Sequence, residues 1–192
     1  MIITISGLPG SGKSTVGRML ANRLGYRFFS IGELRGEIAM RMGKTIDELN
    51  EIGKSEDWTD RQADEHTKRM GETEDDCIID GWVAFHFIPA SFKLFLECNV
   101  CEASRRIFRD QRKDERKARS AAGVQEMISR RLSETDARYR KHYGIDFLDR
   151  GNYDMVIDTT GLSPGQVVER VLAALKRWKG AGIKTIYTKP RK

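Results

Sequence analysis

Eight consecutive residues near the N-terminus have the types and spacing needed to hold a chain of phosphates. Gly7 to Ser14 read G-L-P-G-S-G-K-S and match the pattern G-x-x-x-x-G-K-[ST] at every fixed position. Glycines leave backbone N–H groups uncovered, so these groups can surround phosphate oxygens, and a following helix adds donors and a positive dipole end. Lys13 can reach the β- and γ-phosphates of a nucleotide, and the Ser14 hydroxyl can ligate Mg²⁺. The predicted nucleotide-binding residues are Gly7, Leu8, Pro9, Gly10, Ser11, Gly12, Lys13, Ser14 and Thr15.

The elements around this loop are those that such a loop requires. The apolar run Ile2 to Ser6 predicts a buried strand before it. After it, Val16, Leu20 and Leu24 recur at helical spacing, and Gly25 stands where a helix usually ends. This strand–loop–helix context favours a P-loop over the alternative of a glycine-rich turn without function.

A second acidic position follows the next buried strand. Cys77 to Asp80 is an apolar run that ends in Asp80-Gly81. A carboxylate at that strand end can hold a Mg²⁺-bound water and complete the metal site with Ser14. The alternative is an ordinary Asp-Gly turn.

Strand and helix patterns alternate through the rest of the chain. Further strands are predicted at 27–29, 92–96 and 153–157, and helical patterns at 31–71, from 102, at 124–143 and from 167 to 178. This order predicts an α/β, three-layer fold with a five-stranded parallel sheet and helices on both faces. Residues 1–179 form one predicted domain, and 180–192 a basic C-terminal tail in which 184–188 could add an edge strand.

The composition argues against a membrane protein, a secreted protein and a disulfide-rich protein. The 192 residues are 39% apolar and 32% charged, with a net charge of +6, and no apolar run is long enough to cross a bilayer. No signal peptide precedes the first strand, so we expect a cytoplasmic protein without membrane partners. Three cysteines are too few for a disulfide scaffold. Cys98 and Cys101 have C-x-x-C spacing, which we interpret as packing residues rather than half of a zinc or redox site.

Among P-loop proteins, a small kinase suits this chain best. The guanine-reading element N-K-x-D of small GTPases has no match, since the nearest segment, Thr188-Lys-Pro-Arg, lacks the Asp. A small kinase needs only a core, an acceptor site and a closing lid, and this length can supply them.

Several segments then resemble one family. Gly7 to Thr15, Ser30 to Arg35 and Ile79 to Gly81 occur in the order seen in nucleoside monophosphate kinases. The segments 138–146 (R-Y-R-K-H-Y-G-I-D) and 153–159 (Y-D-M-V-I-D-T) look like the short archaeal-type cytidylate kinases. The resemblance covers about residues 1–175.

That resemblance implies ATP and Mg²⁺ as cofactors and a division of labour. The insertion 31–71 would bind the acceptor nucleotide, and residues 109–123 would form the lid. The implied catalytic residues are Lys13, Arg109, Arg112, Arg131 and Arg138, and the implied acceptor-binding residues are Ser30, Arg35, Asp80, Gly81, Trp82, Arg131 and Arg138. The alternative for any single arginine is a solvated helix face with an i,i+4 partner, as in Glu134 and Arg138.

The family commonly has an arginine where this chain has Trp82, and Arg35 stands one residue from its expected place. Trp58 and the segment Phe85-His86-Phe87 suggest an aromatic acceptor pocket, with His86 expected to be packed between the phenylalanines. We therefore expect ATP-dependent phosphorylation of a nucleoside monophosphate, with CMP or dCMP as the preferred acceptor. We expect the protein to be a monomer, with a homodimer as the alternative. An adenylate or shikimate kinase-like acceptor is the alternative. A nucleotide-regulated RNA-binding protein, suggested by the basic residues 176–192, is disfavoured because no RNA-binding module is recognisable.

Overall fold

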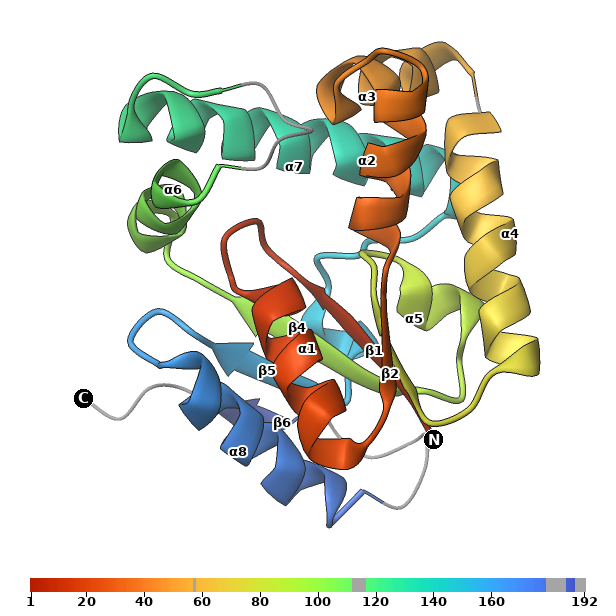
Figure 1. Ribbon diagram of the computed structural model, residues 1–192, viewed down its shortest axis with the longest axis vertical. Coiled ribbons are helices and arrows are strands. Elements are labelled where there is room, and N and C mark those ends of the chain that lie inside the picture. Colours follow the sequence, from red (N-terminus) through yellow and green to blue (C-terminus); the bar gives the residue numbers. More distant parts are fainter. Residues whose placement is uncertain (57, 112–116, 179–185, 189–192) are drawn as a thin grey trace.

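A single parallel sheet forms the centre of the molecule (Figure 1). The computed structural model describes residues 1–56, 58–111, 117–178 and 186–188. In these residues the strands are β1 (Ile2–Gly7), β2 (Arg27–Ser30), β3 (Cys77–Asp80), β4 (Phe92–Glu97), β5 (Met155–Asp158) and β6 (Ile186–Thr188). Their order across the sheet is β2-β3-β1-β4-β5-β6, and all five pairings are parallel.

The predicted three-layer α/β fold is confirmed, with one correction to the number of strands. The sheet has six strands rather than five, because β6 pairs with β5 at the edge. The sequence allowed an edge strand there, so part of the expected basic tail belongs to the sheet. The strand predicted at 153–157 runs from Met155 to Asp158 instead.

Apart from the short α5, which the sequence did not predict, the helices lie where the periodicity predicted them, with small shifts at their ends. They are α1 (Lys13–Leu24), α2 (Ile31–Arg41), α3 (Ile46–Ser55), α4 (Trp58–Thr73), α5 (Ala84–Phe87), α6 (Val100–Arg109), α7 (Ala121–Tyr143) and α8 (Pro164–Leu175), with a 3₁₀ turn η1 (Arg150–Asn152). None of the described helices is long and apolar enough to cross a membrane.

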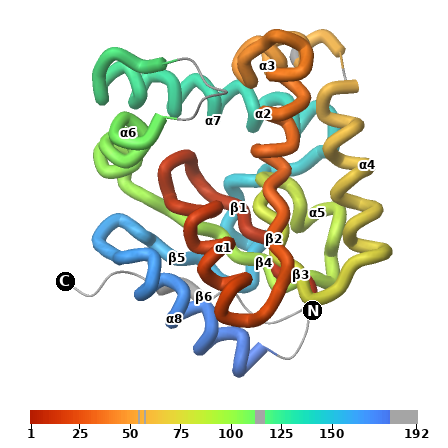
Figure 2. The backbone as a smooth tube through the Cα atoms, in the orientation of Figure 1, coloured from red at the N-terminus to blue at the C-terminus, as the bar shows by residue number. Residues whose placement is uncertain are grey.

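Alternating side chains of the strands build a core on each face of the sheet, as the two-residue period of a strand requires. Leu94 and Leu96 pack with α1 and α8 in one cluster. Phe95, which lies between them in the sequence, packs on the other face with Tyr139 of α7 and with Phe147. Figure 2 shows α1 and α8 side by side along the sheet. Helix α7 crosses the top of the view, beyond the sheet.

Three segments that follow strands meet at the carboxyl edge of the sheet. The loop after β1 leads into α1, and Ser30 ends β2 while Asp80 ends β3. The register pairs Asp80 with both Ser30 and Ile5. Ligand sites of parallel α/β sheets form at this edge, because the strands are parallel and their carboxyl ends coincide.

Candidate active site

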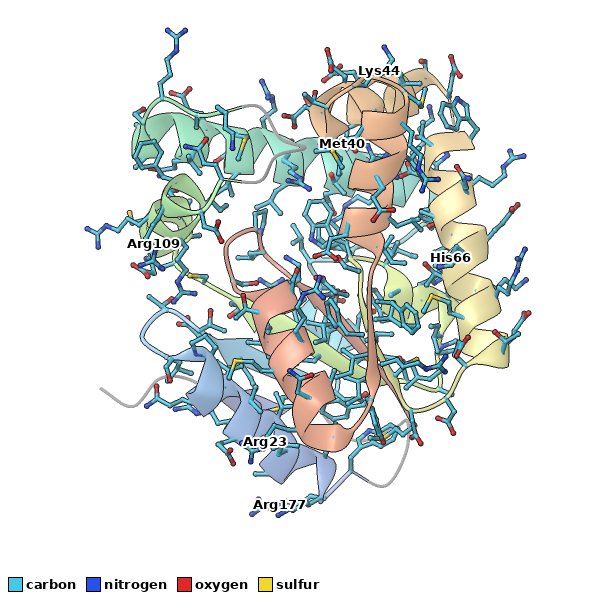
Figure 3. All side chains as sticks on the ribbon, in the orientation of Figure 1. Arg23, Met40, Lys44, His66, Arg109 and Arg177 are labelled. Atoms are coloured by element: carbon cyan, nitrogen blue, oxygen red, sulfur yellow. The ribbon has the colours of Figure 1, made fainter. Side chains whose placement is uncertain are left out.

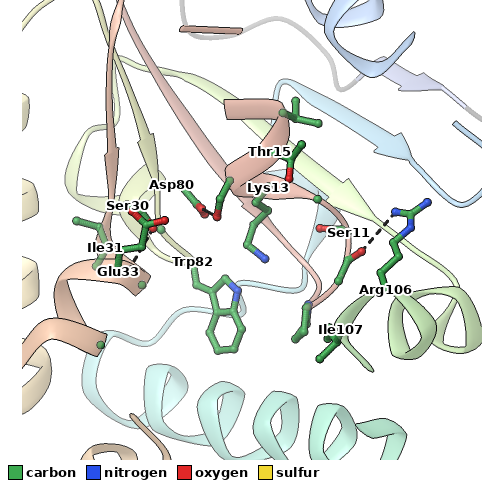
Figure 4. A pocket seen from close by; sticks show the side chains of 18 of the residues that line it. Ser11, Lys13, Thr15, Ser30, Ile31, Glu33, Asp80, Trp82, Arg106 and Ile107 are labelled. Carbon is green, nitrogen blue, oxygen red and sulfur yellow. Dashed lines mark hydrogen bonds between the residues drawn. The ribbon is translucent and has the colours of Figure 1, made fainter. Parts of the chain in front are cut away.

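One cavity of about 970 Å³ joins the glycine-rich loop to the helical insertion (Figure 4). Its wall includes residues 9–16 of the loop and α1, residues of α2 and α3, the end of β3, and side chains from α6, α7 and α8. In Figure 4, Ser30 and Glu33 lie at one end, Lys13 and Trp82 in the middle, and Arg106 and Ile107 at the other end. The glycine-rich loop and the helical insertion therefore line one continuous cavity.

The loop has a backbone conformation that its glycines permit. Gly7, Gly10 and Gly12 have φ values of +147°, +73° and +88°. A Cβ on Gly10 would lie 2.7 Å from the carbonyl oxygen of Ala103 in α6, and one on Gly7 would collide with the backbone of Leu96. Gly7 and Gly10 therefore combine a positive φ with close approach of neighbouring backbone, while Gly12 has the positive φ alone, and residues with side chains rarely adopt these conformations.

Lys13 and Ser11 provide polar groups around the loop. The Lys13 Nζ donates to the carbonyl oxygens of Gly7 and Leu8, each at 3.0 Å. Ser11 is 1% exposed, and its Oγ has no hydrogen-bond partner within the described part of the chain. A buried hydroxyl without a partner is costly. Its position in the loop that lines the cavity fits a phosphate oxygen as the missing partner.

Ser14 and Asp80 meet as the sequence predicted. The Ser14 Oγ donates to Asp80 Oδ2 at 2.6 Å, which joins the first turn of α1 to the end of β3. A hydroxyl and a carboxylate beside a phosphate-binding loop are the oxygen donors that Mg²⁺ prefers. The residues therefore fit the expected metal. Among the described residues, no group of three or more His, Cys, Asp or Glu side chains could hold a metal. The two cysteines with C-x-x-C spacing lie in different surroundings, since Cys98 is buried and Cys101 is exposed.

Six of the seven predicted acceptor-binding residues line the cavity. They are Ser30, Arg35, Asp80, Gly81, Trp82 and Arg131. Ser30 also caps α2, because its Oγ accepts a hydrogen bond from the Glu33 N–H. The Ser6 hydroxyl donates to the carbonyl oxygens of Gly81 (3.1 Å) and Trp82 (2.7 Å), which fixes the backbone that carries the indole.

Trp82 forms part of a stack of planar groups. Its ring lies 5.4 Å from that of Phe147 at an interplanar angle of 18°. The guanidinium carbon of Arg131 lies 5.3 Å from the Trp82 ring centroid, within cation–π range. The indole of Trp82, which stands where the resemblance implied an arginine, therefore contacts an arginine that itself lines the cavity.

The other predicted aromatic contributions do not line this cavity. The Trp58 indole N–H donates to Glu56 at 2.6 Å, and Phe85 is buried against Phe95 and Tyr153. His86 is exposed and contacts the Phe87 and Tyr143 rings, while partial burial lowers the pKa of its imidazole. The prediction of an aromatic acceptor pocket is wrong for these residues, because α5 places Phe85 in the cluster with Phe95 and Tyr153, and Trp58 begins α4 outside the cavity wall. The expected packing of His86 between two phenylalanines is also wrong, since His86 is exposed.

The predicted lid arginines are placed differently from one another. Figure 3 shows Arg109 at the outer end of α6 and Met40 on α2, and both line the cavity although they are far apart in the view. Arg112 lies outside the described residues. Arg138 does not line the main cavity. It is 8% exposed and its Nε lies 2.8 Å from Asp60 Oδ2 of α4.

Arg106 is a cavity residue that the sequence reasoning missed. Its guanidinium pairs with Glu102 at 3.0 Å and donates to the carbonyl oxygens of Thr159 (2.9 Å) and Gly10 (3.4 Å). It thereby joins α6, the loop after β5 and the glycine-rich loop. The only local signal was the i,i+4 spacing of Glu102 and Arg106, which predicts a helix-surface pair and not a cavity contact.

The charges around the cavity are mixed in sign. Its basic side chains are Lys13, Arg35, Arg106, Arg109 and Arg131, and its acidic ones are Glu33, Glu37, Asp80, Glu102 and Asp110. Three of these carboxylates have arginine partners: Arg18 for Glu33 at 2.6 Å, Arg106 for Glu102 at 3.0 Å and Arg41 for Glu37 at 3.9 Å.

Comparison with known proteins agrees with this architecture. Residues 2–161 match the cytidylate kinase-like family. The chain belongs to that family. Cytidylate kinases of Natronomonas pharaonis and Halobacterium salinarum are 35% and 33% identical to it over 182 and 183 residues, which cover 93% of this chain and 91% of each relative.

A third relative is named differently. An S-adenosylmethionine-dependent nucleotide dehydratase of Lacinutrix mariniflava is 34% identical over 171 residues, which cover 88% of this chain but only 35% of that protein. The chain therefore spans about a third of that relative's length. Among solved structures, the shikimate kinase of Bacteroides thetaiotaomicron has a TM-score of 0.64 at 17% identity and covers 92% of this chain and 98% of its own. This likeness shows the fold, that of a P-loop kinase.

Proposed function

We propose that the protein transfers the γ-phosphoryl group of ATP to a nucleoside monophosphate, with CMP or dCMP as the preferred acceptor. The observation that carries the proposal is the single cavity with a phosphate-binding loop at one end and arginines of the helical insertion and α7 at the other. The family match and the cytidylate kinase relatives support the nucleotide class of both substrates.

The donor nucleotide is assigned to the loop end. Residues 7–15 would surround its phosphates, with Lys13 at the β- and γ-phosphates and the Ser11 hydroxyl at a phosphate oxygen. Ser14 and Asp80 would hold Mg²⁺, which supplies charge neutralisation at the phosphates when bound. Arg106, Thr159 and Pro164 line the same end and would contact the nucleoside of ATP.

The acceptor is assigned to the insertion 31–71. Ser30, Arg35 and Arg131 would contact its phosphate, beside Gly81 and Trp82, while Met40, Ile46 and Asn50 line the wall further along α2 and α3. The acceptor phosphate is already anionic, so no strong base is needed. Positioning of the two phosphates and stabilisation of charge in the transition state supply the catalysis.

The segment 109–123 is assigned as the lid. Arg109 is exposed at the end of α6 and lines the cavity, which supports a role in contact with the transferring group. A positive side chain there would stabilise the charge that spreads over the phosphoryl oxygens. Exclusion of water by the lid would limit loss of ATP to hydrolysis.

An acceptor panel tests this function. ATP and Mg²⁺ are supplied with CMP, dCMP, UMP, AMP, shikimate or no acceptor, and ADP release is measured together with the phosphorylated product. We expect the highest kcat/KM with CMP or dCMP and none above background with the Lys13→Ala variant. CMP that stimulates ADP release no better than shikimate or buffer would contradict the cytidylate assignment. A kinase with a different acceptor is the second candidate, because Trp82 stands where the resemblance implied an arginine.

A further inference from the structure

A buried carboxylate lies between two of the predicted acceptor arginines. Asp60 of α4 is 4% exposed. Its Oδ1 accepts a hydrogen bond from Nη1 of Arg35 in α2, and its Oδ2 lies 2.8 Å from Nε of Arg138 in α7. Each carboxylate oxygen is therefore taken by a different guanidinium, and one side chain ties together three helices that are far apart in the sequence.

The same contacts fix the orientation of Arg35. Besides Asp60, its guanidinium donates to the Thr59 carbonyl oxygen at 3.2 Å and to Asn50 Oδ1 at 2.9 Å. Arg35 and Asn50 line the cavity, whereas Asp60 does not. Asp60 therefore supports Arg35 from the side away from the cavity. A guanidinium held by several partners keeps its fork geometry, which suits recognition of a phosphate.

Both arginines of this group pair directly with one carboxylate. Arg35 and Arg138 are both 8% exposed and share the single carboxylate of Asp60. A buried positive charge is stable when it is paired and hydrogen-bonded. An anion at the acceptor end would add negative charge beside Arg35, and a phosphate monoester carries more than one such charge at neutral pH.

We infer that Asp60 is a positioning residue for the acceptor phosphate. It holds the guanidinium of Arg35, which lines the cavity, as a preformed anion subsite for a phosphate monoester group, and Arg138 pairs with the same carboxylate outside the cavity. This inference rests on the proposed function, because it assumes that the acceptor binds at the Arg35 end of the cavity. Asp60 itself touches no substrate and acts through Arg35.

A nearby carboxylate provides a matched control. Asp64 lies four residues further along α4 and accepts a hydrogen bond from the Tyr143 hydroxyl of α7. It links the same two helices without a hydrogen bond to either arginine in the described contacts. If Asp60 only joined α4 to α7, loss of the Asp64 charge would have a comparable effect on acceptor use.

The test compares Asp60→Asn and Asp64→Asn with the wild type. We expect Asp60→Asn to lower kcat/KM for the nucleoside monophosphate about 10- to 100-fold through a raised acceptor KM, while KM for ATP changes less than about twofold. Asp64→Asn should keep both values near those of the wild type. Calorimetric titration of CMP without ATP should show weaker binding to Asp60→Asn only.

The outcomes separate this inference from the proposed function. Suppose that the wild type phosphorylates nucleoside monophosphates, but acceptor kcat/KM is unchanged in folded Asp60→Asn or is lowered equally in Asp64→Asn. That result overturns the inferred role of Asp60 and leaves the proposed function standing. A wild type that phosphorylates no nucleotide overturns the proposed function. If Asp60→Asn does not fold, Asp60→Glu replaces it, because its charge is kept and its carboxylate is displaced. A raised acceptor KM in that variant supports the inference, and an unchanged one overturns it.

Discussion

The contact between Trp82 and Arg131 allows a quantitative test of how this protein positions its acceptor. Their separation of 5.3 Å is within the range of a cation–π interaction, and both side chains are half-buried. Such contacts contribute about 0.5–1 kcal/mol when exposed and about 2 kcal/mol when desolvated, so we expect about 1 kcal/mol here. At 1.4 kcal/mol for each factor of ten, this corresponds to about fivefold in acceptor kcat/KM.

The perturbation is a double-mutant cycle with Trp82→Leu, Arg131→Met and the combined variant. Leucine keeps an apolar side chain against Phe147 but removes the aromatic face. The assay is ADP release at saturating ATP with the best acceptor of the panel. We expect the double variant to lose about fivefold less than the product of the two single losses, because the contact is lost only once.

A neighbouring arginine gives the control. Arg130 is exposed on the same helix and does not line the main cavity, so Trp82→Leu and Arg130→Met should have additive effects. Additivity within about 0.3–0.5 kcal/mol for the Trp82 and Arg131 pair would refute the reasoning. It would mean that the indole does not hold the guanidinium in the functional state.

Three further predictions concern the loop and the helical insertion. Lys13→Ala should lower kcat at least about 10²-fold without loss of helix content by circular dichroism. Gly10→Ala should raise KM for ATP, because its Cβ would meet Ala103. The control is Gly25→Ala, which has a similar φ of +70° but open space around the new Cβ, and it should cost only about 1–2 kcal/mol of stability. Burial raises the pKa of Asp64 from 3.8 to about 6. The wild type therefore loses stability relative to Asp64→Asn as pH rises from 4 to 6, and a pH-independent difference in urea unfolding would contradict this.

The sequence predicted the strand, glycine-rich loop and helix at 2–24 well because every part of that segment is contiguous. Glycine spacing, Lys13 and Ser14 belong to one strand–loop–helix segment, so local rules suffice to recognise it. The parallel sheet also followed from the alternation of strands and helices. Asp80 was found because a strand end can be located from its apolar run, and parallel strands bring their carboxyl ends to one edge.

The acceptor end could not be read in the same way, because its contacts join residues far apart in the chain. Asp60 looked like one acid in a charged helix, and only packing of α2, α4 and α7 placed it between Arg35 and Arg138. Arg138 was predicted as a phosphate-binding residue, a role that stays a prediction, while the structure buries it beside α4.

The aromatic residues illustrate the same division. Side-chain type predicted that Trp58 and the segment Phe85-His86-Phe87 suit stacking, but it carried no information about whether they would line the cavity. None of them does, whereas Trp82 lines it, since it follows β3 at the carboxyl edge. The local sequence pattern thus determined where ATP phosphates are expected to bind. Tertiary packing decided which charged and aromatic side chains line the proposed acceptor end of the cavity. The physical reason is that the energies of burial and of charge pairing depend on contacts between residues that are far apart in the sequence.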